Sequence, residues 1–216
     1  MNKTLVAAII EYAKKLSDEN LVGENGTVSV KEGESAMYIT RHGADLANLT
    51  EADIINVSFF GSANVSEKEK AEIAVHTGIY KAQPETGAIM HTQPVNACVC
   101  ANEGVTIPPV LDDMSQIVGA NIKTAQDLTC EYVLKAIKGR NACLVRNKGM
   151  LSSGRTLDEA YTACLVLEKA AKTFIEGTII GGCVSLGFLD ANLQRFIYKK
   201  KYSKANQAAK MNEEHN

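Results

Sequence analysis

Residues 75–92 read VHTGIYKAQPETGAIMHT, and this stretch joins a helix to a buried strand that ends in a histidine. Ser66 followed by Glu69 is the pattern of a helix N-cap with a returning carboxylate, so a helix is expected to follow Ser66. Residues 87–91 are small or apolar up to His91 and predict a strand. Because open α/β sheets bind ligands at strand ends, His91 is a candidate site residue. A lone histidine in this position is nevertheless more often structural.

The regions on either side of this stretch predict an alternation of helices and short strands. Helical spacing of apolar residues predicts helices at 5–16, from 66 to about 81, and at 95–101, 128–137 and 156–174. Short apolar runs bounded by turn residues predict strands at 27–30, 36–40, 54–60, 87–91, 142–146 and 150–153, the first two forming a hairpin. Since no repeat or linker interrupts the pattern, we expect one α/β domain over residues 1–216, with a polar C-terminal tail from about residue 200 that indicates a solvated, partly frayed helix end.

The composition is that of an ordinary globular chain and excludes several classes of function. A net charge of −2 over 216 residues, with the basic residues spread along the chain, gives no broad face for nucleic acid. No apolar run reaches the length of a membrane span, and the N-terminus lacks the apolar core of a signal peptide. The six cysteines show no CxxC pair or disulfide-like framework. These features favour a cytoplasmic protein with no membrane or nucleic-acid partner.

Two further patterns stand out, and each has an ordinary structural explanation. Glu72 and His76 are four residues apart, which places them on one face of a regular helix. By spacing alone, an exposed helix face with i,i+4 ion pairs explains them better than a site does. Residues 146–149, Arg-Asn-Lys-Gly, have the composition of a tight turn between two strands.

Taken in order, these motifs resemble the class II aldolase, L-ribulose-5-phosphate 4-epimerase and adducin-head family. The resemblance covers about residues 5–180, and residues 75–92 are its most specific part. The matching stretches are residues 26–30, 37–40, 72–80, 84–91 and 147–151. The resemblance implies a single three-layer α/β/α domain with a central, mainly antiparallel sheet.

Members of that family hold a divalent metal, usually zinc, with three histidines, and they use a helix glutamate as acid/base. His91 matches the first of these histidines and Glu72 matches the glutamate, but Gln93 and Lys148 stand where the family has the other two. An amide oxygen is a poor zinc ligand, and an ammonium would occupy the place of the cation. We therefore expect no tightly bound zinc. Loosely held manganese or magnesium, on Glu72, His91, Gln93 and water, is an alternative.

The resemblance also locates a substrate pocket. Its candidate binding residues here are Gly26, Thr27, Thr40, His42, Gly43 and Lys70. Several differ from the family pattern, because threonine replaces an asparagine at 27 and lysine replaces a serine at 70. Positive charge at Arg41, His42 and Lys70 could bind a phosphate or carboxylate, although ordinary surface solvation explains these residues equally well.

By resemblance, the chain is an aldehyde lyase that cleaves or epimerises a small sugar phosphate through an enediolate, with Glu72 as acid/base. Lys148 would supply positive charge in place of the metal, or form a Schiff base. The alternative is a catalytically silent binding or assembly module on the same fold. Relatives assemble as homotetramers, and we expect the same here. The C-terminal region carries aromatic residues suited to an interface, namely Phe188, Phe196, Tyr198 and Tyr202, although a packed C-terminal helix would show the same pattern.

Overall fold

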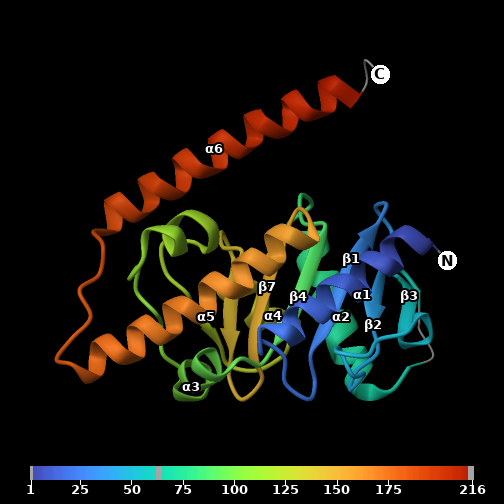
Figure 1. Cartoon of the computed structure of the whole chain (residues 1–216), viewed down its shortest axis with the longest axis horizontal. Helices are drawn as coiled ribbons and strands as arrows, with labels where there is room; N and C mark the ends of the chain where they lie inside the picture. Colours follow the sequence, from blue (N-terminus) through green and yellow to red (C-terminus); the bar gives the residue numbers. More distant parts are fainter. Residues whose placement is uncertain (1, 62–64, 214–216) are drawn as a thin grey trace.

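The computed structural model of the protein describes residues 2–61 and 65–213, with side chains up to residue 201. A seven-stranded sheet forms its centre, in the order β3-β2-β1-β4-β7-β6-β5 (Figure 1). The strands are β1 (Thr27–Glu32), β2 (Ala36–Thr40), β3 (Ile54–Ser58), β4 (Ala88–Thr92), β5 (Thr124–Ala125), β6 (Ala142–Val145) and β7 (Gly149–Gly154). The α-helices are α1 (Lys3–Asp18), α2 (Glu67–Ala82), α3 (Val95–Glu103), α4 (Cys130–Ile137), α5 (Leu157–Ile179) and α6 (Phe188–Glu213).

The sheet is antiparallel throughout, except for the short parallel pair β5 and β6. The expected hairpin of β1 and β2 is confirmed. β4 lies in the middle, paired with β1 on one side and β7 on the other. This register places His91 opposite Thr27 on β1 and opposite Leu151 on β7. The end of β4 is therefore enclosed by strands on both sides.

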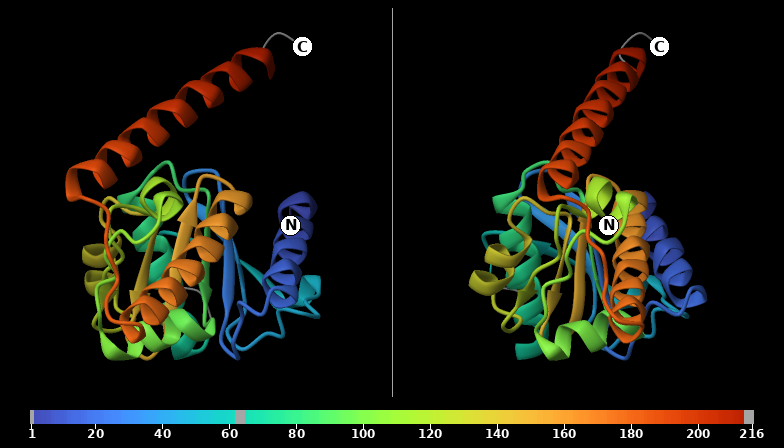
Figure 2. Two further views of the ribbon diagram at one scale, coloured as in Figure 1. Left: turned by 60° about the vertical axis from the view of Figure 1, so that its left-hand side comes forward. Right: turned by 90° about the vertical axis from the view of Figure 1, so that its left-hand side faces the viewer.

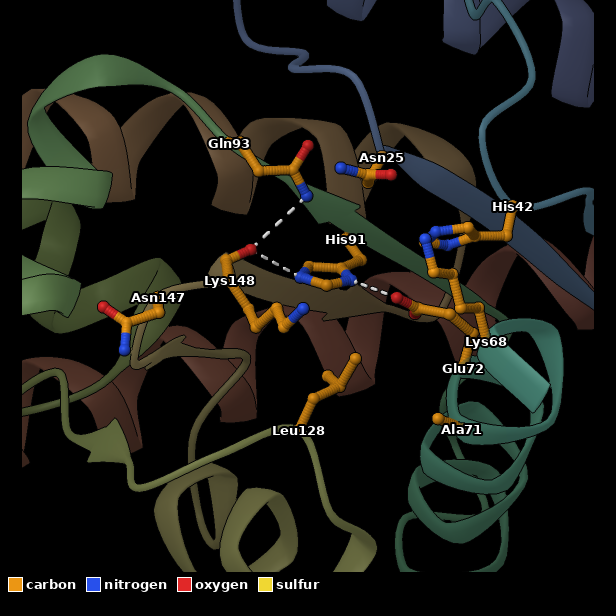
Figure 3. A pocket seen from close by; sticks show the side chains of 10 residues that line it. All are labelled: Asn25, His42, Lys68, Ala71, Glu72, His91, Gln93, Leu128, Asn147 and Lys148. Atoms are coloured by element: carbon orange, nitrogen blue, oxygen red, sulfur yellow. Dashed lines mark hydrogen bonds and ion pairs between the residues drawn. The ribbon is translucent and has the colours of Figure 1, made fainter.

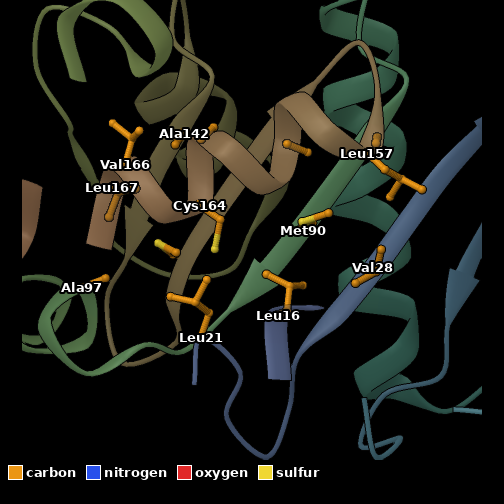
Figure 4. Close-up of a cluster of buried hydrophobic side chains, with 14 of the residues drawn as sticks. Leu16, Leu21, Val28, Met90, Ala97, Ala142, Leu157, Cys164, Val166 and Leu167 are labelled. Carbon is orange, nitrogen blue, oxygen red and sulfur yellow. The ribbon is translucent and has the colours of Figure 1, made fainter. Parts of the chain in front are cut away.

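Helices cover both faces of the sheet, which confirms the three-layer α/β/α architecture (Figures 1 and 2). α2 and α4 lie on one face, and α1, α3 and α5 lie on the other. Successive side chains along β4 point alternately to the two faces of the sheet and so contact the two helix layers in turn. Met90 points into the core against α1 and α5, shown in Figure 4, whereas Ile89 packs into the second core under α2 and α4. His91 shares the face of Ile89 and so points toward α2.

The start of α2 shows why this segment is helical at the predicted place. The hydroxyl of Ser66 accepts a hydrogen bond from the backbone N–H of Glu69 at 3.3 Å, and the Glu69 carboxylate accepts one from the Ser66 N–H at 2.8 Å. This reciprocal capping box satisfies two backbone donors that the helix itself leaves free. Such a cap contributes about 1 kcal/mol. The predicted helix start is confirmed.

Three elements were not foreseen from the pattern. These are the 3₁₀-helix η1 (Glu51–Asp53), a one-turn π-helix, η2 (Met114–Val118), and the two-residue strand β5. α6 continues as helix through Glu213, so the polar segment from about residue 200 forms its C-terminal end. No helix among the described residues is both long and apolar enough to span a membrane.

α6 lies apart from the three layers and contacts the domain through its first turns, which pack against η2 (Figures 1 and 2). The guanidinium of Arg195, 7% exposed, donates to the carbonyl oxygens of Gln116 and Ile117 in η2, both at 2.7 Å. A third bond at 2.5 Å reaches the side-chain oxygen of Asn141. Large apolar side chains along the helix remain exposed, namely Phe188, Leu189, Leu193, Phe196 and Ile197.

Candidate active site

A cavity of about 270 Å³ lies at the end of β4 (Figure 3). α2, the end of β4, the loop after β2 and the turn between β6 and β7 each contribute to its wall. The lining includes His42, Lys68, Glu72, His91, Gln93 and Lys148. The structure thus brings together the helix carboxylate, the strand-end histidine and the lysine of the turn, which the sequence pattern singled out separately.

His91 makes a hydrogen bond at each ring nitrogen. Its Nδ1 lies 2.8 Å from Oε1 of Glu72, and its Nε2 lies 2.8 Å from the backbone carbonyl oxygen of Lys148 (Figure 3). A carbonyl oxygen can only accept, and so can an ionised carboxylate. Both ring nitrogens therefore donate, which makes His91 an imidazolium paired with the Glu72 carboxylate.

The pKa directions agree with this charge state. Burial opposes the charged form of Glu72, but the charge and hydrogen bond of His91, with smaller help from His76 and His42, lower the pKa of Glu72 below its usual range. Burial also opposes the charged form of His91. The charge and hydrogen bond of Glu72 and the Lys148 carbonyl outweigh it and raise the pKa of His91. Both side chains are almost completely inaccessible to solvent, so each stabilises the other's charge.

The turn between β6 and β7 explains how a backbone carbonyl reaches His91. Asn147 has φ +57° and Gly149 has φ +92°, both in the left-handed region that asparagine and glycine tolerate best. A Cβ at Gly149 would clash with the backbone of Thr92, so only glycine fits here. The turn therefore directs the Lys148 carbonyl oxygen at the His91 ring. The Lys148 side chain runs beside that ring in Figure 3.

The second oxygen of Glu72 faces the interior of the protein. Thr27 Oγ1 lies 3.4 Å from Glu72 Oε2 and 3.5 Å from Nε2 of His76. His76 Nδ1 lies 2.8 Å from the Ser29 hydroxyl, which in turn lies 2.7 Å from the hydroxyl of Tyr80. Burial is the main cause that lowers the pKa of His76 to about 4 and that raises the pKa of Tyr80. Both side chains are therefore uncharged at neutral pH.

In this arrangement the residues at the family's metal positions bind protein groups. A histidine ligand needs an unprotonated nitrogen with a free lone pair, and both nitrogens of His91 lie at hydrogen-bonding distance from protein oxygens. The Gln93 amide nitrogen lies 3.4 Å from the same Lys148 carbonyl oxygen (Figure 3). Within residues 2–61 and 65–213, no three histidine, cysteine, aspartate or glutamate side chains are grouped as a metal site.

Of the six predicted substrate-binding residues, one lines the cavity and five do not. His42 lines the cavity, with a buried Nδ1 that has no partner among the described residues. Lys70 does not line the cavity. Its exposed ammonium group pairs with Glu67 at 2.6 Å. Lys68 lines the cavity instead. The sequence did carry a signal for Lys68, which precedes Glu72 by one helical turn and so shares its face.

The four other predicted binding residues lie in the packed interior or in a turn, outside the cavity. Thr27 is fully buried against Glu72, and Thr40 is buried with its hydroxyl accepting from the Val28 N–H at 3.0 Å. A Cβ at Gly26 would lie 2.7 Å from Leu46 Cδ1, so a larger residue would require the Leu46 side chain to move. Gly43 has φ +77° in an open turn. None of the four is among the residues that line the cavity.

Comparison with known proteins places the chain in a family. The model of the class II aldolase and adducin N-terminal domain matches residues 7–175. The 5-methylthioribulose-1-phosphate/5-deoxyribulose-1-phosphate aldolase of Rhodospirillum rubrum is 28% identical over 173 residues, 77% of this chain and 78% of that protein. The L-fuculose phosphate aldolase of Methanocaldococcus jannaschii is 27% identical over 174 residues, 76% of this chain and 91% of that protein. A solved L-fuculose 1-phosphate aldolase superposes with a TM-score of 0.84 at 25% identity, covering 92% of this chain and 98% of that one.

Proposed function

The chain belongs to the class II aldolase and adducin N-terminal domain family, and from this premise we propose that it is a sugar-phosphate lyase that works without a tightly bound metal. Its substrate is a small phosphorylated carbonyl compound, the class on which the named relatives act. Glu72 is the acid/base, and Lys148 supplies the positive charge. The expectation of a site without zinc, made from Gln93 and Lys148, is part of this proposal.

The observation that supports the proposal is a buried ionised carboxylate on the wall of a cavity lined by cations. Glu72 and His91 form one neutral pair, so the ammonium groups of Lys68 and Lys148 leave the lining with an excess of positive charge. A phosphate or an enediolate is the kind of ligand that such a lining favours.

The proposed reaction is a retro-aldol cleavage. Glu72 accepts the proton of the hydroxyl group β to the substrate's carbonyl. The electron pair of that O–H bond forms the new aldehyde C=O, and the carbon–carbon bond breaks. Its electrons move to the original carbonyl oxygen, giving an enediolate that the Lys148 ammonium stabilises. Glu72 then returns the proton to the enediolate carbon, so no oxidant or external acid is needed.

The test is an aldehyde-release assay with a panel of ketose and aldose phosphates, run with and without EDTA. The proposal expects turnover that EDTA does not abolish and that Glu72→Gln and Lys148→Met each reduce at least about 100-fold. Lys172→Met removes an equal charge from an exposed pair with Glu176 and serves as the matched control. Turnover that needs added Mn²⁺ or Mg²⁺ would instead support the loosely held metal. Turnover unaffected by Glu72→Gln would refute the assignment of the base.

Lys148 could act either as a positive charge or as a Schiff-base nucleophile, and one experiment distinguishes the two roles. Borohydride reduction in the presence of dihydroxyacetone phosphate, followed by mass spectrometry, labels Lys148 if the lysine forms a Schiff base. An active enzyme that stays unlabelled uses Lys148 as a charge only.

A second function on the same fold is a catalytically silent binding or assembly module. This function is favoured because both ring nitrogens of His91 already form hydrogen bonds with protein groups, which leaves neither for a metal or a substrate. Absence of turnover with the whole panel, together with measurable binding of a sugar phosphate or of inorganic phosphate, would support this function over the lyase.

We further propose a homotetramer in which α6 contributes to subunit contacts. Phe188, Leu189, Leu193, Phe196 and Ile197 are all more than half exposed on this helix. Their burial between subunits would remove an unusually large apolar surface from water.

A further inference from the structure

A row of hydrogen-bonding side chains leads from Glu72 away from the cavity and into the core beneath α2. Thr27, His76, Ser29 and Tyr80 follow one another with gaps of 3.4, 3.5, 2.8 and 2.7 Å, counted from the Glu72 carboxylate. None of the five is more than 3% exposed. The row runs from β1 to α2, so it joins the sheet to the helix that carries the acid/base.

The proton inventory of these groups fixes the direction of every bond. The ionised carboxylate only accepts, so the single proton of Thr27 points at Glu72. The Thr27 oxygen then accepts from His76, whose proton must lie on Nε2. Neutral His76 therefore has a bare Nδ1, which accepts from the Ser29 hydroxyl. The oxygen of Ser29 is left to accept from Tyr80.

The reverse direction is excluded by the same inventory. If His76 carried its proton on Nδ1 and donated to Ser29, the hydroxyl groups of Ser29 and Tyr80 would have only the contact between them for their two protons. One of these two protons would then have no partner among the described residues, although neither side chain is more than 2% exposed. Nε2 of His76 would also turn a lone pair toward the Glu72 carboxylate, 3.7 Å away. Both features are costly for buried groups.

We propose that Thr27, His76, Ser29 and Tyr80 are a positioning relay that orients the Glu72 carboxylate. The relay donates to Oε2, so that Oε1 is left for His91 and the cavity. Thr27 thereby acquires a role different from substrate binding. The catalytic consequence rests on the proposed lyase function, but the order of the protons does not.

The direct test of the proton order is ¹⁵N NMR of the full-length protein labelled at histidine. The relay expects the His76 signal of a neutral ring with the proton on Nε2. It also expects Ser29→Ala to shift the Nδ1 resonance, because that nitrogen loses its donor. Ser152→Ala is the matched control, since Ser152 is equally buried and donates to the carbonyl oxygen of Ala160 at 2.8 Å. A wild-type His76 protonated on Nδ1, or on both nitrogens, overturns the proposal.

The test of the consequence compares two substitutions at one position. Thr27→Val keeps the shape but removes the hydroxyl, and Thr27→Ser keeps the hydroxyl. The relay expects kcat to fall about tenfold in Thr27→Val with KM unchanged, and to be largely retained in Thr27→Ser. Thr92→Val is the control, because Thr92 is equally buried but directs its hydroxyl to Cys164 on the other face of the sheet.

The outcomes remain distinguishable if the lyase proposal fails. Equal kcat values in Thr27→Val and Thr27→Ser would refute the positioning role even when the proton order is as expected. A protein without turnover would refute the lyase proposal, and the NMR measurement would still decide the proton order.

Discussion

Removing the imidazole of His76 is expected to make the protein markedly less sensitive to acid. Burial lowers the pKa of His76 from 6.5 to about 4, so between these values the unfolded chain binds a proton that the folded chain does not. Stability therefore rises with pH across this window, and the penalty is complete below pH 4. The side chain is completely buried, so solvent screening does not reduce the effect.

The size of the effect follows from the shift. A difference of roughly 2.5 pKa units corresponds to roughly 3 kcal/mol in total, and about 2 kcal/mol of it falls between pH 7 and pH 4.5. The other buried groups of the site titrate mainly outside this window. The raised pKa of His91 adds stability that is present below about 6.5 and is lost as the pH rises through the folded value. The lowered pKa of Glu72 adds stability that is lost only as the pH falls below about 4.5.

The assay is urea unfolding at pH 7 and pH 4.5 for the wild type, His76→Gln and His76→Asn. The two variants differ in reach, so their stabilities at pH 7 are expected to differ. Both lack the titrating ring, so both should lose about 2 kcal/mol less than the wild type on acidification. A wild type and variants that lose the same free energy, within about 0.5 kcal/mol, would refute the assignment of a buried neutral His76.

Three further predictions concern other parts of the molecule. Lys148→Met should weaken binding of inorganic phosphate by at least about tenfold in isothermal titration, because it removes one ammonium from the cavity lining; unchanged affinity would place the anion elsewhere. Arg195→Met should loosen α6 and raise amide hydrogen exchange along it, since three partly buried acceptors lose their charged donor at about 1–3 kcal/mol each; unchanged exchange would mean that other contacts hold the helix. The double substitution Leu193→Glu and Phe196→Glu should convert the proposed tetramer to smaller species in light scattering, because each apolar side chain buried between subunits would contribute about 1.5–3 kcal/mol; an unaltered mass would refute the role of α6.

The helices, strands and turns near the site were predictable because their signals are local. The Ser66 and Glu69 cap, the apolar run that ends at His91 and the glycine of the turn at 149 each act over a few residues. The family resemblance predicted the three-layer arrangement and the mainly antiparallel sheet. The extent of α6 was not predictable because its apolar residues have few partners within the chain, so its polar segment indicated only a solvated helix end.

The interior of the site was not predictable for two physical reasons. The acceptor at His91 Nε2 is a backbone carbonyl, which no side-chain pattern reveals. Thr27 and Ser29 alternate with valines on β1, a pattern typical of a strand with one solvated face. The structure covers that face with α2, so the hydroxyl groups meet His76 instead of water.

The central claim is a family site in which protein hydrogen bonds have replaced the metal. Its most direct test is elemental analysis of the purified full-length protein by plasma mass spectrometry, after expression in zinc-supplemented medium and without chelators. The account predicts well under one zinc per chain, because both nitrogens of His91 donate to acceptors and Gln93 and Lys148 occupy the other ligand positions. One zinc per chain that is lost on His91→Ala would contradict it.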